Sequence, residues 1–498
     1  MTEFLLPEAT IAEMSRAMGA GALTAEQLVR MYLERIAAYD RAGVTLNSVL
    51  EINPDALHIA EALDRERKLS GPRGPLHGIP VMIKDNIDTA DKLHTSAGSL
   101  ALASSYAPRD AAVAERLRRA GAVILGKVNM TEWANFMTIG MPSGYSSRGG
   151  QVLNPYLPGK LTPSGSSAGS GVAVAANLCA VAIGTETSGS ILSPSNNNSV
   201  VGIKPTVGLI SRTGIIPIAF SQDTAGPMAR TVADAATLLG ALVGVDPADP
   251  ATAVSAGRAY RDYTRFLDKG GLRGARIGVP RGPWVERLDA DEQRLFDEAV
   301  RAIRAAGAEV VDPADLKYMK YWDSNVLVYE FKPALNRYLA SLGPAAPVRS
   351  LKEIVAFNEE NPEAMLRYGQ KLMAQAEATS GTLTEPEYLL DRLRDLRQTR
   401  SEGIDATLEE HRLDALLFPG TWGCWIPARA GYPSIQVPAG YTGDGRPFGI
   451  TLTGPAWSEP TLIRLGYAYE QATLLRRPPQ LEQAAVAPQE PPPAEDED

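Results

Sequence analysis

Short apolar segments alternate with segments of helical periodicity along most of this 498-residue chain, and this alternation restricts its fold most. Residues 78–88 (GIPVMIKDNID) are rich in β-branched residues and bounded by Gly and Pro, which is typical of a strand. Residues 111–127 and 168–184 each predict a helix followed by an apolar strand, and the order strand, helix, strand recurs over 275–312. The sequence therefore predicts an α/β fold with a large mixed, mostly parallel β-sheet covered on both faces by helices.

The second half of the chain changes in character before strand patterns return. Residues 315–410 are charged, aromatic and helical in pattern, whereas 413–420 again predicts a strand. Residues 434–454 predict two strands joined by a turn around Asp444–Gly445. From 476 onward the sequence is rich in proline and acidic residues, which is typical of disorder. We therefore expect one domain over residues 1–475, with a helical insertion at about 315–410 near the substrate entrance, and a disordered tail over 476–498.

Charge and cysteine content limit the partners and the compartment. The formal net charge is −9, and five of the acidic residues lie in the last nine positions, so the folded body is only mildly acidic. A nucleic-acid surface needs a basic face, and no dense Lys/Arg run occurs. The longest apolar stretch, 171–184, is too short to span a bilayer, no secretory signal is apparent, and two cysteines cannot form a disulfide framework. We expect a cytoplasmic protein without nucleic-acid or membrane partners.

Two motif matches point to other enzyme classes, and both lack a required feature. Residues 121–128 (GAVILGKV) approach a phosphate-binding loop, but Val128 stands where the Mg²⁺-binding hydroxyl is needed. GSSAG at 165–169 would make Ser167 a hydrolase nucleophile, but no strand directly precedes it and only His411 follows as a base. The four histidines show no metal-ligand spacing, so we expect neither a metal nor another cofactor.

Three polar side chains stand out against these alternatives. Lys84 ends the apolar strand IPVMIK, Ser166 lies in the Gly/Ser loop 162–171, and Ser190 lies in a second such loop, 184–195. A Gly/Ser run alone is usually a flexible linker, and a lysine at a strand end is usually solvated. Here both loops flank one compact apolar segment, so neither joins two domains.

Long stretches around these residues resemble the amidase signature hydrolases. The resemblance is carried by GPLHGIPVMIKDNID, SGSSAGSGVAVAANLCAVAIGTETSGSI and the segment ending SQDTAGPMARTVADAA. The resemblance extends over roughly residues 20–475 and is densest over 74–235. Within the family, the motif SQDTAGPMART is most similar to that of the peptide-amidase-like branch. The resemblance implies the amidase signature fold and a hydrolase that needs no cofactor.

The same resemblance implies a catalytic triad of the type Ser–cis-Ser–Lys. It assigns Ser190 as nucleophile, Ser166 as the bridging serine that follows a cis peptide, and Lys84 as base. The implied oxyanion hole consists of the backbone N–H groups of Thr187, Ser188, Gly189 and Ser190.

Elementary chemistry agrees with these roles. A serine hydroxyl is a weak nucleophile that needs a base, and a protonated lysine cannot accept a proton. Burial of Lys84 in an apolar sheet would lower its pKa, because burial disfavours the charged form. Ser166 could then accept a proton from Ser190 while donating one to Lys84.

Two departures from the family pattern bear on the substrate. Ser188 stands where many members have Gly, and Leu192 stands where many have Arg. Without that positive charge beside the nucleophile, a neutral apolar or aromatic acyl group is favoured over an acidic one. Aromatic residues of the insertion are expected to line the substrate entrance, or alternatively to pack its own core, namely Tyr318, Tyr321, Trp322, Tyr329 and Phe331.

The sequence thus predicts a serine hydrolase that cleaves C–N acyl bonds through an acyl-enzyme. Candidate substrates are small molecules: amides, peptide C-terminal amides and anilides, with carbamates (a urethanase activity) and esters as further candidates. The alternatives are a tRNA-dependent amidotransferase component of the glutaminase type and a non-catalytic binding protein on the same scaffold. Either a monomer or a homodimer is expected.

Overall fold

A single large sheet organises the computed structural model, which describes residues 4–317 and 325–482. In those residues eleven strands hydrogen-bond in the order β1-β3-β2-β6-β8-β7-β12-β13-β11-β9-β10. Their bounds are β1 (Val49–Ile52), β2 (Pro80–Lys84), β3 (Val123–Val128), β6 (Val181–Glu186), β7 (Val201–Lys204), β8 (Thr224–Ala229), β9 (Arg276–Gly278), β10 (Glu309–Val311), β11 (Ala415–Pro419), β12 (Ser434–Tyr441) and β13 (Pro447–Thr453). A separate hairpin is formed by β4 (Tyr145–Ser146) and β5 (Gly150–Gln151).

The sheet mixes parallel and antiparallel pairing. Parallel pairs join β2 to both β3 and β6, and join β9 to both β11 and β10. The remaining pairs are antiparallel. Among them, β12 and β13 are joined by the tight turn that the sequence predicts around Asp444–Gly445. The prediction of a large mixed α/β sheet is confirmed.

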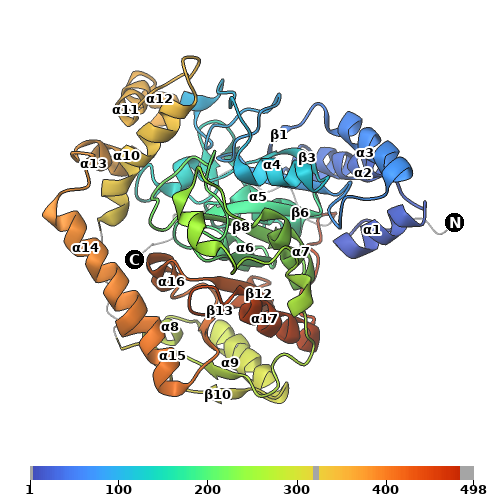
Figure 1. Ribbon diagram of the computed structural model, residues 1–498, viewed down its shortest axis with the longest axis vertical. Coiled ribbons are helices and arrows are strands. Elements are labelled where there is room, and N and C mark those ends of the chain that lie inside the picture. Colours follow the sequence, from blue (N-terminus) through green and yellow to red (C-terminus); the bar gives the residue numbers. More distant parts are fainter. Residues whose placement is uncertain (1–3, 318–324, 483–498) are drawn as a thin grey trace.

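Helices cover both faces of this sheet (Figure 1). The helices outside the insertion are α1 (Ile11–Gly19), α2 (Ala25–Arg35), α3 (Ala56–Ser70), α4 (Ala112–Arg119), α5 (Ala168–Ala175), α6 (Leu192–Asn197), α7 (Val232–Leu242), α8 (Gly282–Glu286), α9 (Ala290–Ala305), α16 (Trp425–Ala430) and α17 (Glu459–Thr473). Gly466 of α17 packs against Ile435 of β12. The next residue of β12, Gln436, pairs with Gly202 of β7, and Gly202 packs against Ser195 of α6. Successive strand residues point to opposite faces, so α6 and α17 lie on opposite sides of the sheet.

Helix α5 lies unusually close to the sheet, because it is built almost entirely from small residues. All eight of its residues are buried. A Cβ added at Gly169 would lie only 2.3 Å from the Asn129 carbonyl oxygen, so only glycine fits there. This close packing brings the start of α5, directly after Ser166 and Ser167, next to β2 and β6.

Between β10 and β11 the described chain is helical. The insertion contains α10 (Val326–Ser341), α11 (Leu351–Glu360), α12 (Pro362–Met365), α13 (Lys371–Glu377), α14 (Pro386–Leu396) and α15 (Asp405–His411). Phe331 of α10 packs edge-on against Phe136, with ring centroids 4.9 Å apart, within a second buried cluster that also contains Trp133. Figure 1 shows α10 to α14 along one side of the molecule.

The chain is still anchored where the acidic tail was expected to begin. Arg476 pairs with Glu8 at 2.8 Å and donates to the Ser199 carbonyl at 2.6 Å. The ordered body therefore continues past residue 475, at least to this arginine.

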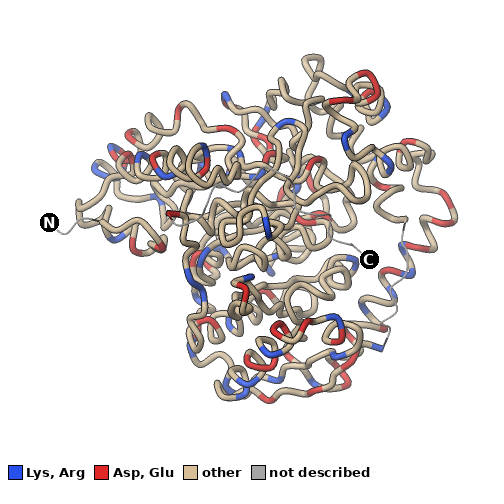
Figure 2. Tube along the Cα trace, turned by 180° about the vertical axis from the view of Figure 1, so that it is seen from behind, with Lys and Arg blue, Asp and Glu red and all other residues tan. Residues whose placement is uncertain are grey.

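Charged residues of both signs are interspersed along the trace in Figure 2. No helix within residues 4–317 and 325–482 has the length and apolar character that a membrane crossing requires.

Candidate active site

Lys84 lies at the carboxyl end of β2, at the edge where the parallel strands β2 and β6 end side by side. Its side chain is fully buried. Its Nζ lies 2.7 Å from Ser166 Oγ and 2.9 Å from Ser167 Oγ. It also lies 3.0 Å from Thr185 Oγ1 and 3.2 Å from the Thr185 carbonyl oxygen. The amine is thus surrounded by hydroxyl and carbonyl oxygens, without a carboxylate in hydrogen-bond contact among the described residues.

This environment favours the uncharged amine. Burial lowers the pKa of Lys84 to about 7, although the carboxylates of Glu186 and Asp223 act in the opposite direction. Desolvation outweighs those charges because a buried ammonium loses its hydration. A large fraction of Lys84 can therefore accept a proton near neutral pH.

The two loops that carry the serines are joined directly. The Ser167 backbone N–H donates to the Ser190 carbonyl at 3.2 Å. Ser166 is fully buried, and the Gly165–Ser166 peptide is cis, as the resemblance implied. Within the described residues no hydrogen bond joins the hydroxyls of Ser190 and Ser166, so of the two contacts that the predicted relay needs, the structure contains only the one between Ser166 and Lys84.

The loop from 187 to 190 follows β6 and presents free backbone donors. In the described part of the chain, the N–H groups of Ser188 and Ser190 have no protein acceptor. Ser188 is exposed and has a negative φ, so the loop tolerates the side chain that replaces the family's glycine. Gly189 has φ of 78°, and a Cβ added there would lie 3.0 Å from Ser193 Oγ and 3.1 Å from Cys424 Sγ, which explains why this position needs glycine.

Glu186 holds the start of α6 against this loop. Its Oε2 accepts from the backbone N–H groups of Ile191 and Leu192 at 2.6 and 2.9 Å. Burial raises the pKa of Glu186, while the charge of Lys204 and these backbone hydrogen bonds lower it.

Thr187 is fixed by two residues of the segment that precedes β8. Its Oγ1 donates to Asp223 at 2.5 Å, and its carbonyl accepts from Gln222 Nε2 at 3.1 Å. Asp223 also accepts from the backbone N–H groups of Ile218 and Ala219, both at 2.9 Å. This clamp fixes the first residue of the loop 187–190, which we call the nucleophile loop after the role predicted for Ser190.

Sequence reasoning missed three members of the site. Ser167 was considered only as an alternative nucleophile, yet it contacts Lys84 and also donates to the Thr185 carbonyl at 3.1 Å. Thr185 and Asp223 received no role. Their only sequence signal is their place in the quoted motifs GTETSGSI and SQDTAGPMART.

Aromatic residues of the insertion have mixed positions. Tyr318, Tyr321 and Trp322 lie outside the described residues. Phe331 is buried in the second cluster, and Tyr329 stacks near Tyr388 with ring centroids 5.9 Å apart. The core-packing alternative holds for Phe331, whereas Tyr329 is only half-buried and lies outside that cluster. No group of three or more potential metal ligands occurs in residues 4–317 and 325–482.

A fold with a buried lysine among serine hydroxyls at the carboxyl end of parallel strands is that of an amidase-type hydrolase, and comparisons agree. The family profile described as Amidase matches residues 27–426. A probable amidase of Arabidopsis thaliana is 44% identical over 488 residues, covering 96% of this chain and 92% of that protein. The crystal structure of a peptide amidase from Stenotrophomonas maltophilia is 48% identical with a TM-score of 0.90, covering 96% of this chain and 99% of that one.

A component of the glutamyl-tRNA(Gln) amidotransferase of Azorhizobium caulinodans is more distant, at 35% identity over 94% of this chain and 97% of that protein. The chain belongs to the amidase family, which confirms the resemblance seen in the sequence. It is an amide hydrolase.

Proposed function

We propose that this enzyme cleaves amides through an acyl-enzyme on Ser190, with Ser166 as bridging serine and Lys84 as base. The observation that carries the proposal is the buried Lys84 amine, 2.7 Å from the Ser166 hydroxyl, with a pKa near 7. Such an amine can take a proton from a hydroxyl without a histidine.

In the acylation step, Ser190 Oγ attacks the amide carbon while its proton passes to Ser166, and the Ser166 proton passes to Lys84. The carbonyl π electrons move onto oxygen, and the resulting oxyanion is held by free N–H groups of the loop 187–190. Collapse of the intermediate breaks the C–N bond, and the relay returns the proton to the leaving amine. Water then attacks the ester by the same route and releases the carboxylic acid.

The substrate class follows from the surroundings of the nucleophile. Leu192 is fully buried directly after the nucleophile loop and brings no charge to it. Together with the likeness to a peptide amidase, this favours neutral primary amides, including peptide C-terminal amides. Anilides, carbamates and esters are further candidates that share the same acyl chemistry.

Ser190→Ala and Lys84→Met are expected to abolish nearly all turnover of a neutral peptide amide, while far-UV circular dichroism stays unchanged. Ser193→Ala, in the adjacent first turn of α6, is the matched control and should retain activity. A sulfonyl fluoride should label Ser190, identified by peptide mass. Retained turnover in Ser190→Ala, or labelling of Ser167 in its place, would refute the assignment.

The pH dependence tests the base independently. Because the neutral amine is the active form, kcat/KM should rise with pH through about 7, the pKa of Lys84, and then level off. A profile that falls over the same range would contradict a lysine base.

The amidotransferase alternative is supported by the 35% identity to a component of such an enzyme. It requires glutaminase activity and further protein components. Turnover of peptide amides by the purified chain alone, without hydrolysis of glutamine, would exclude it. Sizing of the same sample tests the prediction of a monomer or homodimer.

A further inference from the structure

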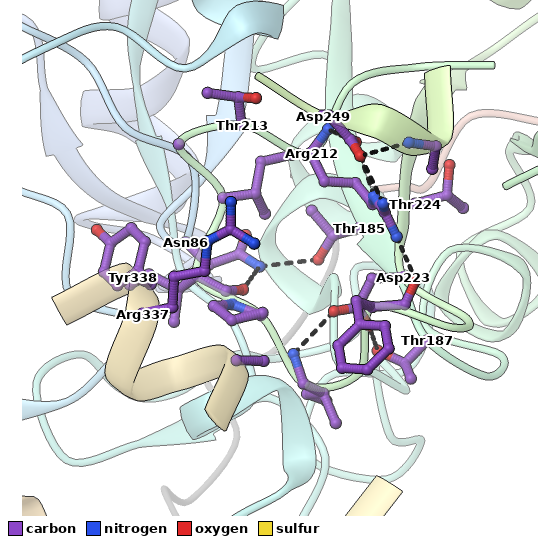
Figure 3. Close-up of a pocket in the computed structure, with 18 of the residues that line it drawn as sticks. Asn86, Thr185, Thr187, Arg212, Thr213, Asp223, Thr224, Asp249, Arg337 and Tyr338 are labelled. Carbon is purple, nitrogen blue, oxygen red and sulfur yellow. Dashed lines mark hydrogen bonds and ion pairs between the residues drawn. The ribbon is translucent and has the colours of Figure 1, made fainter. Parts of the chain in front are cut away.

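A cavity of about 560 Å³ lies beside the nucleophile loop, separate from the three triad side chains. Its walls come from β6, the segment 212–224, residues 248–251 and helix α10 (Figure 3). Neither Lys84, Ser166 nor Ser190 lines it, but Thr187 and Asp223, which form the clamp on the nucleophile loop, do. We call it the Arg337 cavity.

The size and lining of the Arg337 cavity suit a small organic ligand. Pockets of about 300–1,000 Å³ with mainly apolar walls and a few placed polar groups are typical of ligand sites. The apolar wall is formed by Ile215, Ile216, Ile218, Phe220 and Ala334. An aliphatic side chain of a ligand would be buried against these residues.

One cation in the wall is uncommitted. Arg337 extends from α10 into the cavity (Figure 3), and within the described residues it has no hydrogen bond or ion pair. Arg212, the other guanidinium of the wall, is occupied by Asp249 through contacts of 2.6 and 2.8 Å. Arg337 is exposed and can receive an anion that enters from solvent.

One buried acceptor in the wall is also without a partner. Asn86 is 2% exposed, and its Oδ1 has no hydrogen bond in the described part of the structure. Its Nδ2 donates to Thr185 Oγ1 at 2.9 Å, which fixes the amide with Oδ1 left over. A buried polar atom without a partner is costly, so a ligand with an N–H donor would complete this site.

The other carboxylates of the wall do not oppose an anion at Arg337 strongly. Asp249 is neutralised by Arg212. Asp223 accepts from Thr187 and two backbone N–H groups, and burial raises its pKa to about 6. Glu186 accepts two backbone N–H groups at its Oε2 while its Oε1 has no partner in the described residues, and burial raises the pKa of this carboxyl, which favours its uncharged form.

We propose that the Arg337 cavity binds a free amino acid with an apolar side chain. The carboxylate meets the Arg337 guanidinium, the ammonium donates to Asn86 Oδ1, and the side chain packs on the isoleucine wall. The ligand then contacts the clamp formed by Thr187 and Asp223, so its occupancy bears directly on the nucleophile loop. The proposal concerns binding and does not depend on the proposed function.

Calorimetric titration of L-leucine into the full-length Ser190→Ala enzyme tests the site without turnover. Saturable 1:1 binding is expected, and Arg337→Met should weaken it about tenfold or more, because a charge-assisted bond is lost. The matched control is Arg301→Met, on the exposed side of α9, which should leave the affinity unchanged. No heat with leucine, or equal affinity in Arg337→Met, overturns the proposal.

Analogues test each polar contact. 4-Methylpentanoate lacks the ammonium and 3-methylbutylamine lacks the carboxylate, so each should bind at least about tenfold more weakly than leucine. Equal binding of either analogue overturns the assigned contacts. Wild-type enzyme labelled at Ser190 should still bind leucine, whereas loss of binding after labelling would place leucine at the nucleophile and refute a separate site. Failure of the proposed function would appear independently, as absent labelling.

Discussion

Replacing Lys84 by methionine should stabilise the fold in a strongly pH-dependent way. The side chain is fully buried, and burial lowers its pKa from 10.5 to about 7. At pH values between these two pKa values, the Lys84 amine is protonated in the unfolded chain and neutral in the folded chain. The stability of the wild-type enzyme therefore rises with pH over this range, by about 1.4 kcal/mol per pH unit from this group.

Methionine has a similar length and does not titrate. The free energy of unfolding of Lys84→Met minus that of wild type should therefore be largest at or below pH 7. This difference should decrease by about 5 kcal/mol as the pH rises toward 10.5. The absolute offset also contains the lost hydrogen bonds of the amine, so the change with pH is the diagnostic quantity.

Urea unfolding followed by circular dichroism at several pH values from 6 to 10 measures this difference. Lys269→Met, at an exposed position, is the matched control and should show no such slope. A difference between Lys84→Met and wild type that is constant over the whole range would mean that Lys84 keeps its proton when folded. The reasoning for a lysine base would then be wrong.

Three further predictions follow from individual contacts. Thr187→Val removes the 2.5 Å bond to Asp223. Because the loop is then misplaced, kcat in steady-state assays should fall about tenfold to hundredfold while KM changes little. An unaltered kcat would show that the clamp is not needed. Gly184→Ala would place a Cβ 2.9 Å from Ser167 Oγ. We therefore expect thermal melts to show a loss of about 1–3 kcal/mol of stability, and we expect reduced labelling of Ser190. Wild-type values for both measurements would contradict this packing. Dialysis against EDTA should leave turnover unchanged because the proposed steps use an amine as base, and a loss restored by added metal would require another mechanism.

Much of the fold could be predicted because local patterns determine local backbone. The apolar segment ending in Lys84 forms β2, the small-residue segment after Ser167 forms α5, and the turn at Asp444–Gly445 joins β12 to β13. The cis peptide before Ser166 was also anticipated, through the resemblance. The directions of the central strands depend instead on how distant segments pair, which no single segment specifies.

The candidate site likewise contains residues that the sequence could identify and contacts that it could not. Lys84, Ser166 and Ser190 could be named from motifs, since each lies in a distinctive local sequence. Ser167 as a partner of Lys84 and Asp223 as a partner of Thr187 could not, because these contacts span 83 and 36 positions. They exist only once β2 and β6 are neighbours and β8 pairs with β6.

The sequence by itself determined the α/β character, the family and the three side chains to which the chemistry is assigned, because those depend on residue type and short-range spacing. Only the tertiary structure decided that the amine is buried and has a pKa near 7, because desolvation depends on everything packed around it. It also decided that Arg337 of α10 shares a cavity with Asn86, some 250 positions earlier in the chain. Burial and convergence are properties of the packed sheet and its helices, and they arise only when the whole chain has folded.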